Sequence, residues 1–501
     1  MRRRTFLGAL GTPPLAVLAQ PPKPSIAGFA ERDITPDIGM EQPGGYGKVY
    51  HQTFHDACKV RAAVFEDGKA RAALVGVDAL VVPRQMVLGA RRRITERCGI
   101  APEAVMIGAS HSHSSGPVGM VLPGEYDHSS RLVQDLAYKH SSAADAGYLR
   151  RVEDAIVEAV TRADSSRQAA LMSFGAGRED KAAFNRRFRM KNGLSYTHPG
   201  NGNPDIVEVA GPIDPVVTVA GSWTAQGKLL GCLVNYCCHA TTSPGGISAN
   251  WIYYMEQVIR GAFGKDVIVV FLQGFSGDVT QVDNLSPYRR QTGEESARFV
   301  CGRVGAEVVK VLFSAYPGES APVSARNRVL RIPRRAPSPE RLKKCLEIVR
   351  RDPKTVGATE WSFAKETVML DALLAKEKVA DVEVQAVEVG PVLFLAAPGE
   401  MFCQFGLDLR AGSKFPFTAP VELANGSVGY VPTEEAMGPR GGGYETRLTS
   451  YSNLVVPAGS QMVRAALELA TGMTPGPVPH PPPAPPFKEP WSYGNVGPRN
   501  S

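Results

Sequence analysis

The fold class is decided by Ala-Val-Met-Ile-Gly-Ala-Ser-His-Ser-His-Ser-Ser-Gly-Pro at residues 104–117, where an apolar run passes directly into a polar cluster. The run Ala104–Ala109 has no polar face, which predicts a strand covered on both sides, as in α/β sheets. Gly116-Pro117 is a turn signal that ends the segment. We therefore expect a buried strand whose carboxyl end carries a functional loop.

That loop contains two histidines, His111 and His113, two residues apart. In extended geometry both side chains would point to the same side. Such a pair can ligate one metal ion together, or one imidazole can ligate while the other serves as acid, base or hydrogen-bond donor. A polar surface loop with two solvated histidines has the same pattern, so the spacing alone leaves both interpretations open.

Three later stretches repeat this design of an apolar run that ends in polar residues: 229–238, 267–272 and 392–397. Ligands of α/β sheets bind outside the carboxyl ends of the strands, so these ends are expected to converge on one crevice. The sequence therefore predicts an α/β fold with mixed, largely parallel sheets flanked by helices. The side chains expected at the crevice are His111, His113, His239, Asp278, Thr280 and Glu400.

The amino terminus reads Met-Arg-Arg-Arg-Thr-Phe-Leu-Gly, followed by a short apolar stretch that ends near Ala19. Consecutive arginines before Phe-Leu are typical of a twin-arginine export signal. We predict a signal peptide over residues 1–19 and a periplasmic or secreted product. The apolar stretch is too short to span a bilayer and contains Pro13-Pro14, which argues against a permanent transmembrane anchor.

Composition narrows the class of partner. The 501-residue chain has a net charge of +7, of which Arg2, Arg3 and Arg4 contribute three, so +4 would remain after cleavage. It shows no basic patch with interleaved aromatic residues, and we expect no nucleic-acid partner. The eight cysteines form no C-x-x-C pair, which disfavours a redox protein, although Cys237-Cys238 beside His239 could supply a thiolate ligand.

We expect one large catalytic domain over residues 20–473, with a helical insertion at 338–379 and a polar loop over the crevice at 119–147. The Pro-rich stretch 474–501 is predicted to be an extended or disordered tail. Three smaller features stay open. The first is Asn185-Arg186-Arg187, which is either a solvated loop or the source of an arginine that contacts a substrate oxygen. The other two are Asp78 and His55-Asp56, which either orient metal ligands or cap turns.

Together these motifs resemble the neutral/alkaline, non-lysosomal ceramidase family. The resemblance is to the N-terminal catalytic domain of that family. Residues 110–117 resemble that family's T-H-T-H-S-G-P, Asn235–His239 its N-F-x-x-H, and Gln273–Thr280 its G-D-V-S loop. The remaining matches are Asn185-Arg186 with N-R-S, Pro398–Glu400 with P-G-E, and residues 425–435 with N-x-Y-x-x-Y-x-T-x-E-E. All occur in the family's order, between residue 26 and about residue 470.

The resemblance implies one zinc ion per chain, held by His111, His239, Glu400 and Tyr430. Two neutral imidazoles and two oxygen donors suit zinc and leave a position for an activated water. The family's second histidine corresponds to His113, which would hydrogen-bond or protonate the reacting amide. The resemblance places Arg186 near the substrate oxygens, and we expect Asp278 and Thr280 to shape the site.

Two departures bear on the substrate. The family has a serine where this chain has Thr280, and its C-terminal β-sandwich is not expected here. Threonine keeps the hydroxyl but adds a branch, which suits water orientation better than unhindered attack. The resemblance implies hydrolysis of a ceramide-like N-acyl amide to fatty acid and sphingoid base. Its substrate would be small and amphipathic, and transient membrane-surface contact is possible. The alternatives are another amide or ester, or a non-catalytic lipid- or glycan-binding homologue.

Overall fold

The computed structural model describes residues 25–288, 292–488 and 497–498, so the predicted signal peptide 1–19 lies outside the described residues. Three larger sheets form the body of the molecule. The first has the strand order β4-β3-β2-β1-β5, the second β13-β12-β11-β6 and the third β15-β16-β17-β19. Their strands are β1 (Ile26–Asp33), β2 (Lys59–Glu66), β3 (Arg71–Val77), β4 (Val105–Ala109), β5 (Gln168–Ala169), β6 (Leu171–Arg178), β11 (Val216–Trp223), β12 (Leu229–Tyr236), β13 (Ile268–Gln273), β15 (Val323–Pro333), β16 (Val379–Val389), β17 (Val392–Ala396) and β19 (Phe417–Val421).

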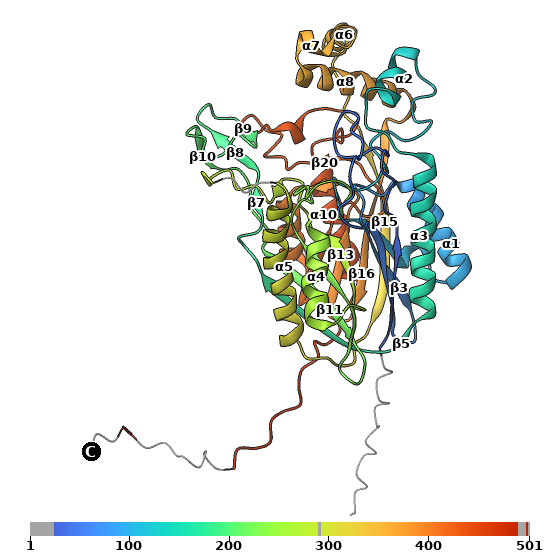
Figure 1. Cartoon of the computed structure of the whole chain (residues 1–501), viewed down its shortest axis with the longest axis vertical. Coiled ribbons are helices and arrows are strands. Elements are labelled where there is room, and N and C mark those ends of the chain that lie inside the picture. Colours follow the sequence, from blue (N-terminus) through green and yellow to red (C-terminus); the bar gives the residue numbers. More distant parts are fainter. Residues whose placement is uncertain (1–24, 289–291, 489–496, 499–501) are drawn as a thin grey trace, which may run out of the picture.

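The sheets pack face to face between helices (Figure 1). Helices α1 (Arg84–Cys98) and α3 (Ala146–Ser165) cover the first sheet, and α4 (Trp251–Phe263) and α5 (Glu294–Ser314) cover the second. Helices α9 (Cys403–Gly412) and α10 (Ala458–Thr471) cover the third. Strand β13 contacts β2, β3 and β4 across the interface between sheets, which explains why the predicted strands 104–109 and 267–272 are apolar on both faces.

The predicted largely parallel sheets are wrong, because most strand pairs are antiparallel. The reason is the short connections. β2 and β3 are joined by a turn in which Asp67 Oδ1 accepts from the amides of Lys69 and Ala70, and β16 and β17 are joined through Gly390 at φ 57°. Such tight turns can link only antiparallel neighbours.

Parallel pairing nevertheless occurs where the polar stretches begin. β4 lies parallel to β3, β12 to β13 and β17 to β19. The carboxyl ends of these pairs meet at one edge of the molecule, so the predicted convergence of the strand ends is confirmed. Short strands complete this edge: β7 (Phe184–Asn185), β8 (Arg187–Met190), β9 (Ser195–Thr197), β10 (Ile206–Val209), β14 (Val279–Thr280), β18 (Glu400–Met401) and β20 (Tyr430–Val431).

A helical cap stands above this edge, seen at the top of Figure 1. Residues 338–379 form α6 (Pro339–Ile348), α7 (Pro353–Val356) and α8 (Ala358–Lys376), as the insertion was predicted to be helical. The loop 119–147 contributes α2 (Arg131–Tyr138), which contacts α8. Trp361, Met369 and Leu373 of α8 share an apolar cluster with Leu136 of α2.

Residues 474–488, the described part of the Pro-rich stretch, contain neither helix nor strand. Across the part of the chain that the structure describes, no helix has both the length and the apolar composition needed to cross a membrane. The domain boundaries at residues 19 and 473 stay predictions.

Candidate metal centre

The site begins with three side chains from three strand ends. His111 follows β4, His239 follows β12, and Glu400 opens β18 just after β17. All three are buried, with at most 1% of the residue exposed. His111 adopts φ 62°, a left-handed conformation that costs a non-glycine residue free energy. Hydrogen bonds from the amides of Ser110 to Val77 and of Ser112 to Ala79 hold the backbone on both sides of it.

Each of the three side chains points one atom at the other two. His111 Nε2 lies 3.1 Å from His239 Nε2, and Glu400 Oε2 lies 3.1 Å from His111 Nε2 and 3.2 Å from His239 Nε2. Ligand atoms of a metal ion about 2 Å away would be spaced by roughly this distance. The spacing of the triangle therefore suits a small metal ion.

The backbone fixes which ring nitrogens face the triangle. His111 Nδ1 lies 2.9 Å from the carbonyl of Leu80, and His239 Nδ1 lies 2.7 Å from that of Ser276. A carbonyl only accepts, so each Nδ1 must donate, which leaves a lone pair on each Nε2 of a neutral ring. Orientation of a ligand imidazole by a carbonyl on its other nitrogen is the usual arrangement around metal ions.

Glu400 gives an independent indication. Its Oε1 accepts a hydrogen bond of 2.9 Å from Tyr451 Oη, whereas Oε2 is a buried atom with no hydrogen-bond partner among the described residues. A carboxylate oxygen facing two imidazole lone pairs in buried space is costly unless a cation lies between them. The donor set therefore fits a divalent metal ion.

His113 lies beside the triangle. Its Nε2 is 3.3 Å from His111 Nε2, and one nitrogen from each of His111, His113 and His239 lies within 4.8 Å of the others, so the three could hold a metal ion. Burial lowers the pKa of His239 to about 3 and holds the pKa of His113 well below its ordinary value. Neutral imidazole is the form that binds a metal or accepts a proton.

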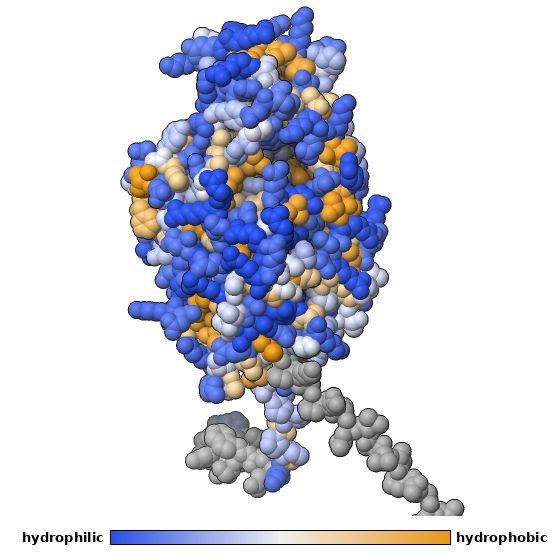
Figure 2. Space-filling model, turned by 90° about the vertical axis from the view of Figure 1, so that its right-hand side faces the viewer, coloured by the Kyte–Doolittle hydropathy of each residue, from blue (hydrophilic) through white to orange (hydrophobic). Residues whose placement is uncertain are grey.

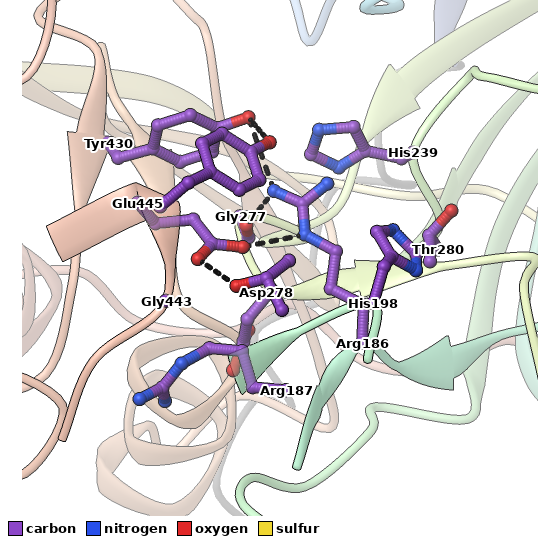
Figure 3. Close-up of polar contacts among 12 residues, drawn as sticks. Arg186, Arg187, His198, His239, Gly277, Asp278, Thr280, Tyr430, Gly443 and Glu445 are labelled. Atoms are coloured by element: carbon purple, nitrogen blue, oxygen red, sulfur yellow. Dashed lines mark hydrogen bonds and ion pairs between the residues drawn. The ribbon is translucent and has the colours of Figure 1, made fainter. Parts of the chain in front are cut away.

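Arg186 forms the second half of the site (Figure 3). Its Nε donates to Glu445 Oε1 at 2.9 Å, and its Nη2 donates to the carbonyl of Gly277 at 2.8 Å and to Tyr430 Oη at 3.2 Å. Tyr430 Oη is also 2.7 Å from Tyr444 Oη. Figure 3 shows the guanidinium between Tyr430 and His239, so a buried positive charge lies beside one member of the triangle.

A cavity of about 60 Å³ opens over these groups, lined by His111, His113, Glu400, Tyr430, Tyr444 and Tyr451 among others. Burial and the Glu400 carboxylate raise the pKa of Tyr430 well above its ordinary value, so without a metal its hydroxyl stays protonated. Tyr430 thus lines the same cavity as His111 and Glu400.

No protein-family model matches the chain. The neutral ceramidase of Pseudomonas aeruginosa is 27% identical over 307 residues, which cover 57% of this chain and 42% of that protein. The crystal structure of neutral ceramidase from Pseudomonas aeruginosa superposes with a TM-score of 0.64 at 19% identity, covering 91% of this chain and 76% of that one. The structure described as a ceramidase complexed with C2 gives the same TM-score at 18% identity, covering 91% of this chain and 77% of that one.

The chain resembles neutral ceramidase in sequence and in fold. Its sequence match spans less than half the length of that curated neutral ceramidase. Four of the residues singled out from sequence lie together around the cavity: His111, His113, Glu400 and Tyr430. His239 and Arg186 adjoin them through the contacts given above.

Asp278 and Thr280 are not among the residues that line this cavity. The Asp278 carboxylate accepts from Asn185 Nδ2 and from the amide of Cys403, both at 2.8 Å, and so holds the strand ends around Arg186 in place. Thr280 Oγ1 donates to Gln281 Oε1 at 2.8 Å and lies 3.3 Å from Thr241 Oγ1. Figure 3 shows it on the far side of Arg186 from Tyr430.

The other residues considered from sequence make contacts of their own. Cys238 Sγ lies 3.6 Å from the carbonyl oxygen of His239, and Cys237 Sγ lies 2.8 Å from that of Phe275, so both thiols are engaged with backbone carbonyls. Asp78 binds Arg61 at 2.7 Å, and Asp56 binds the amide of Ala249 at 2.8 Å. Both acids are structural partners of the backbone and of a buried arginine.

Sequence reasoning missed three groups of this site: Tyr444, Tyr451 and Gly44. Gly44 has φ 105°, and a Cβ placed on it would lie 2.3 Å from His113 Nδ1. The Gly-rich turn 44–47 was a visible signal, because glycine is needed where a backbone approaches closely. The two tyrosines lie on a loop with no local pattern, and only the fold brings them to Glu400 and Tyr430.

Proposed function

We propose that this chain is a zinc-dependent hydrolase that cleaves the amide bond of ceramide-like N-acyl amides. The observation that carries the proposal is the triangle of His111 Nε2, His239 Nε2 and Glu400 Oε2, with the Glu400 oxygen otherwise unpartnered. Similarity to the neutral ceramidase of Pseudomonas aeruginosa supports amide hydrolysis, and the ceramide-like substrate rests on that similarity.

His111, His239 and Glu400 would hold the zinc ion, with Tyr430 as the fourth ligand. Zinc bound there would supply Lewis acidity that activates a water molecule for attack on an acyl carbonyl. Arg186 provides a buried, fixed positive charge with which the chain can stabilise developing negative charge on the carbonyl oxygen. The neutral imidazole of His113, whose Nε2 is 3.3 Å from His111 Nε2, would take a proton from the attacking water and pass it to the nitrogen of the leaving amine.

The test measures metal content and fatty-acid release together. The purified chain is expected to hold one zinc ion and to release fatty acid from ceramide or from a simpler N-acyl amide. His111→Ala should lose both the metal and the activity. His480→Ala is the matched control, because His480 is exposed and hydrogen-bonds only to the carbonyl of Pro481 among the described residues.

Full activity in His111→Ala would overturn the proposed centre. Stoichiometric zinc with turnover of other amides but none of ceramide would keep the hydrolase and exclude the ceramide-like substrate. Absence of both metal and turnover in the wild-type chain would refute the enzymatic proposal.

We also propose that the protein is exported through the twin-arginine route, on the strength of Arg2-Arg3-Arg4-Thr-Phe-Leu. Replacing Arg2, Arg3 and Arg4 together by lysine should retain the protein in the cytoplasm, because the route reads the arginine pair itself. Fractionation of cells expressing the two forms measures this. Equal export of both forms would contradict it.

A further inference from the structure

A buried carboxylate near the metal triangle has no part in the mechanism proposed above. The face of the molecule drawn in Figure 2 is mostly hydrophilic, as expected where charged side chains gather at the surface. Glu422, which directly follows β19, is an exception because none of its surface is exposed. Burial raises the pKa of this carboxyl well above its ordinary value, although its hydrogen bonds favour the ionised form. A group that is so costly to bury calls for an explanation.

The two oxygens of Glu422 bind two different segments of the chain. Oε1 accepts a hydrogen bond of 2.6 Å from Ser276 Oγ, in the loop that follows β13. Oε2 accepts a hydrogen bond of 2.9 Å from the amide of Met401, the last residue of β18. One carboxylate therefore joins two segments that are distant in sequence.

Each of these segments holds one member of the triangle. The carbonyl of Ser276 accepts from His239 Nδ1 at 2.7 Å and so orients that imidazole. Met401 directly follows Glu400. The 3.2 Å between His239 Nε2 and Glu400 Oε2 therefore depends on how the two segments are held together.

Gln273 fixes the direction of the serine hydrogen bond. Its Nε2 donates to the carbonyl of Cys238 at 2.8 Å, and a carbonyl can only accept, so this atom is the amide nitrogen. The same Nε2 donates to Ser276 Oγ at 2.7 Å, which leaves the serine proton for Glu422 Oε1. The amide of Met401 is a donor as well. Both side-chain oxygens at position 422 must therefore accept, which a carboxylate can do and a carboxamide cannot.

We propose that Glu422 is a positioning residue of the metal centre, whose carboxylate joins Ser276 to Met401 and thereby fixes the separation of the ligand atoms of His239 and Glu400. This role rests on the proposed function, because it presumes a metal ion in the triangle. Metal binding alone can test it, without any substrate.

The first measurement is zinc affinity, obtained by competition with a chromogenic chelator for the full wild-type chain and for Glu422→Gln. Glutamine keeps the size of the side chain but offers one acceptor oxygen in place of two. The dissociation constant of zinc should rise about 10–100-fold, the usual effect of removing a group that orients metal ligands. An unchanged dissociation constant would overturn the proposal.

Glu388→Gln is the matched control. Glu388 is 1% exposed and accepts from Ser324 Oγ at 2.5 Å, so the same substitution removes the same kind of contact. Glu388 pairs with Leu393 near the start of β17, whereas Glu400 follows the end of that strand. Zinc affinity should be unchanged in this variant. Equal losses in both variants would show that general destabilisation weakens the site, and would overturn the proposal.

Ser276→Ala removes the connection on the His239 side alone. It should weaken zinc binding about fivefold, the cost of one hydrogen bond. In the double variant with Glu422→Gln the loss should be smaller than the product of the two single losses, because both changes break the same hydrogen bond. Losses that multiply would show that the two residues act separately and would overturn the proposal. If Glu422→Gln does not fold, unaltered zinc affinity in Ser276→Ala would overturn it.

Cobalt(II) bound in place of zinc reports the geometry of its ligands through its visible absorption. The spectrum should change in Glu422→Gln and match the wild type in Glu388→Gln, a difference that loss of stability alone would not produce. Hydrolysis by the wild-type chain is measured separately. Weaker zinc binding in Glu422→Gln without wild-type turnover would refute the proposed function and keep the role of Glu422, and turnover with unaltered zinc binding would do the reverse.

Discussion

The Nε2 atoms of His111 and His239 lie 3.1 Å apart, while the opposite nitrogen of each ring meets a backbone carbonyl. Two lone pairs and the Glu400 carboxylate therefore face one another in a buried space. This arrangement is unfavourable by itself and favourable around a cation. Metal binding and folding stability should be linked at this point.

Removal of metal should lower the thermal stability of the chain. A ligand at about 100 times its dissociation constant stabilises the folded state by about 2.7 kcal/mol, so return of zinc after chelation should raise Tm by a few degrees. Differential scanning calorimetry measures the change. Glu400→Gln should show no zinc-dependent shift, and an undiminished shift in that variant would exclude Glu400 as a ligand.

Gly44→Ala should lower kcat/KM, whereas its loss of stability should match that of a control glycine variant. The new methyl group would meet His113 Nδ1 at 2.3 Å, so the imidazole must move. Gly39→Ala is the matched control: Gly39 also has a positive φ, of 89°, but has nothing within 4 Å of its Cβ position. We expect similar losses of stability, about 1 kcal/mol each, and a fall in kcat/KM for Gly44→Ala alone. Equal kcat/KM values would show that His113 is not positioned by this glycine.

Lys365→Met should destabilise the cap. The substitution leaves Ser141, two carbonyls and Glu366 without their buried cation, a loss of about 3–5 kcal/mol in the free energy of unfolding. Urea denaturation measures it. Lys376→Met, at the exposed end of the same helix, should change the free energy by less than about 0.5 kcal/mol. A small effect of Lys365→Met would mean that α8 is held by its apolar contacts alone.

Thr280→Val should leave most of the activity, because the hydroxyl that it removes is bonded to Gln281 and Thr241. We expect kcat/KM to fall by less than about tenfold, the cost of one neutral hydrogen bond. Inactivity of Thr280→Val would instead support a catalytic hydroxyl.

Arg186→Lys should lower kcat/KM by about 10²–10³, because lysine cannot reproduce the guanidinium contacts with Glu445, Gly277 and Tyr430.

Acid should weaken one ion-pair cluster away from the site. Burial opposes ionisation of Glu256, but Arg61, Lys59 and Arg260 hold its pKa below the ordinary value of 4.5. A carboxyl with a lowered folded pKa stabilises the protein above the unfolded value, and this contribution is lost as pH falls through the folded pKa. The stability difference between wild type and Glu256→Gln should therefore shrink below about pH 4.5, and a constant difference in acid unfolding would contradict this.

The four buried strands and the residues at their ends could be predicted because apolar runs and motif spacing are local in sequence. Strand direction was predicted wrongly, although a signal existed. Asp67-Gly68 between two apolar runs is typical of a hairpin, as is Gly390 between Val389 and Val392. An antiparallel strand is usually recognised by alternating apolar and polar residues. These strands lack that alternation because both of their faces are buried.

The parts of the site that sequence could not give are those made by contacts between distant segments. The carbonyls of Leu80 and Ser276 orient the imidazoles, and any residue type could supply them. Tyr451 reaches Glu400 from a loop 51 residues further along the chain. Asp278 lies in the motif at residues 273–280, yet its carboxylate accepts hydrogen bonds from Asn185 Nδ2 and from the backbone amide of Cys403.

The cap and the metal triangle are carried by different stretches of the chain. The triangle stands on the ends of central strands, whereas a neighbouring cavity of about 570 Å³ is lined in part by the 119–147 loop and the 338–379 helices. Changes in those two insertions can therefore alter which molecules are accepted while the groups that would hold the metal stay fixed. Such a division makes the scaffold evolvable: new specificities can arise by drift in peripheral segments around an unaltered reactive centre.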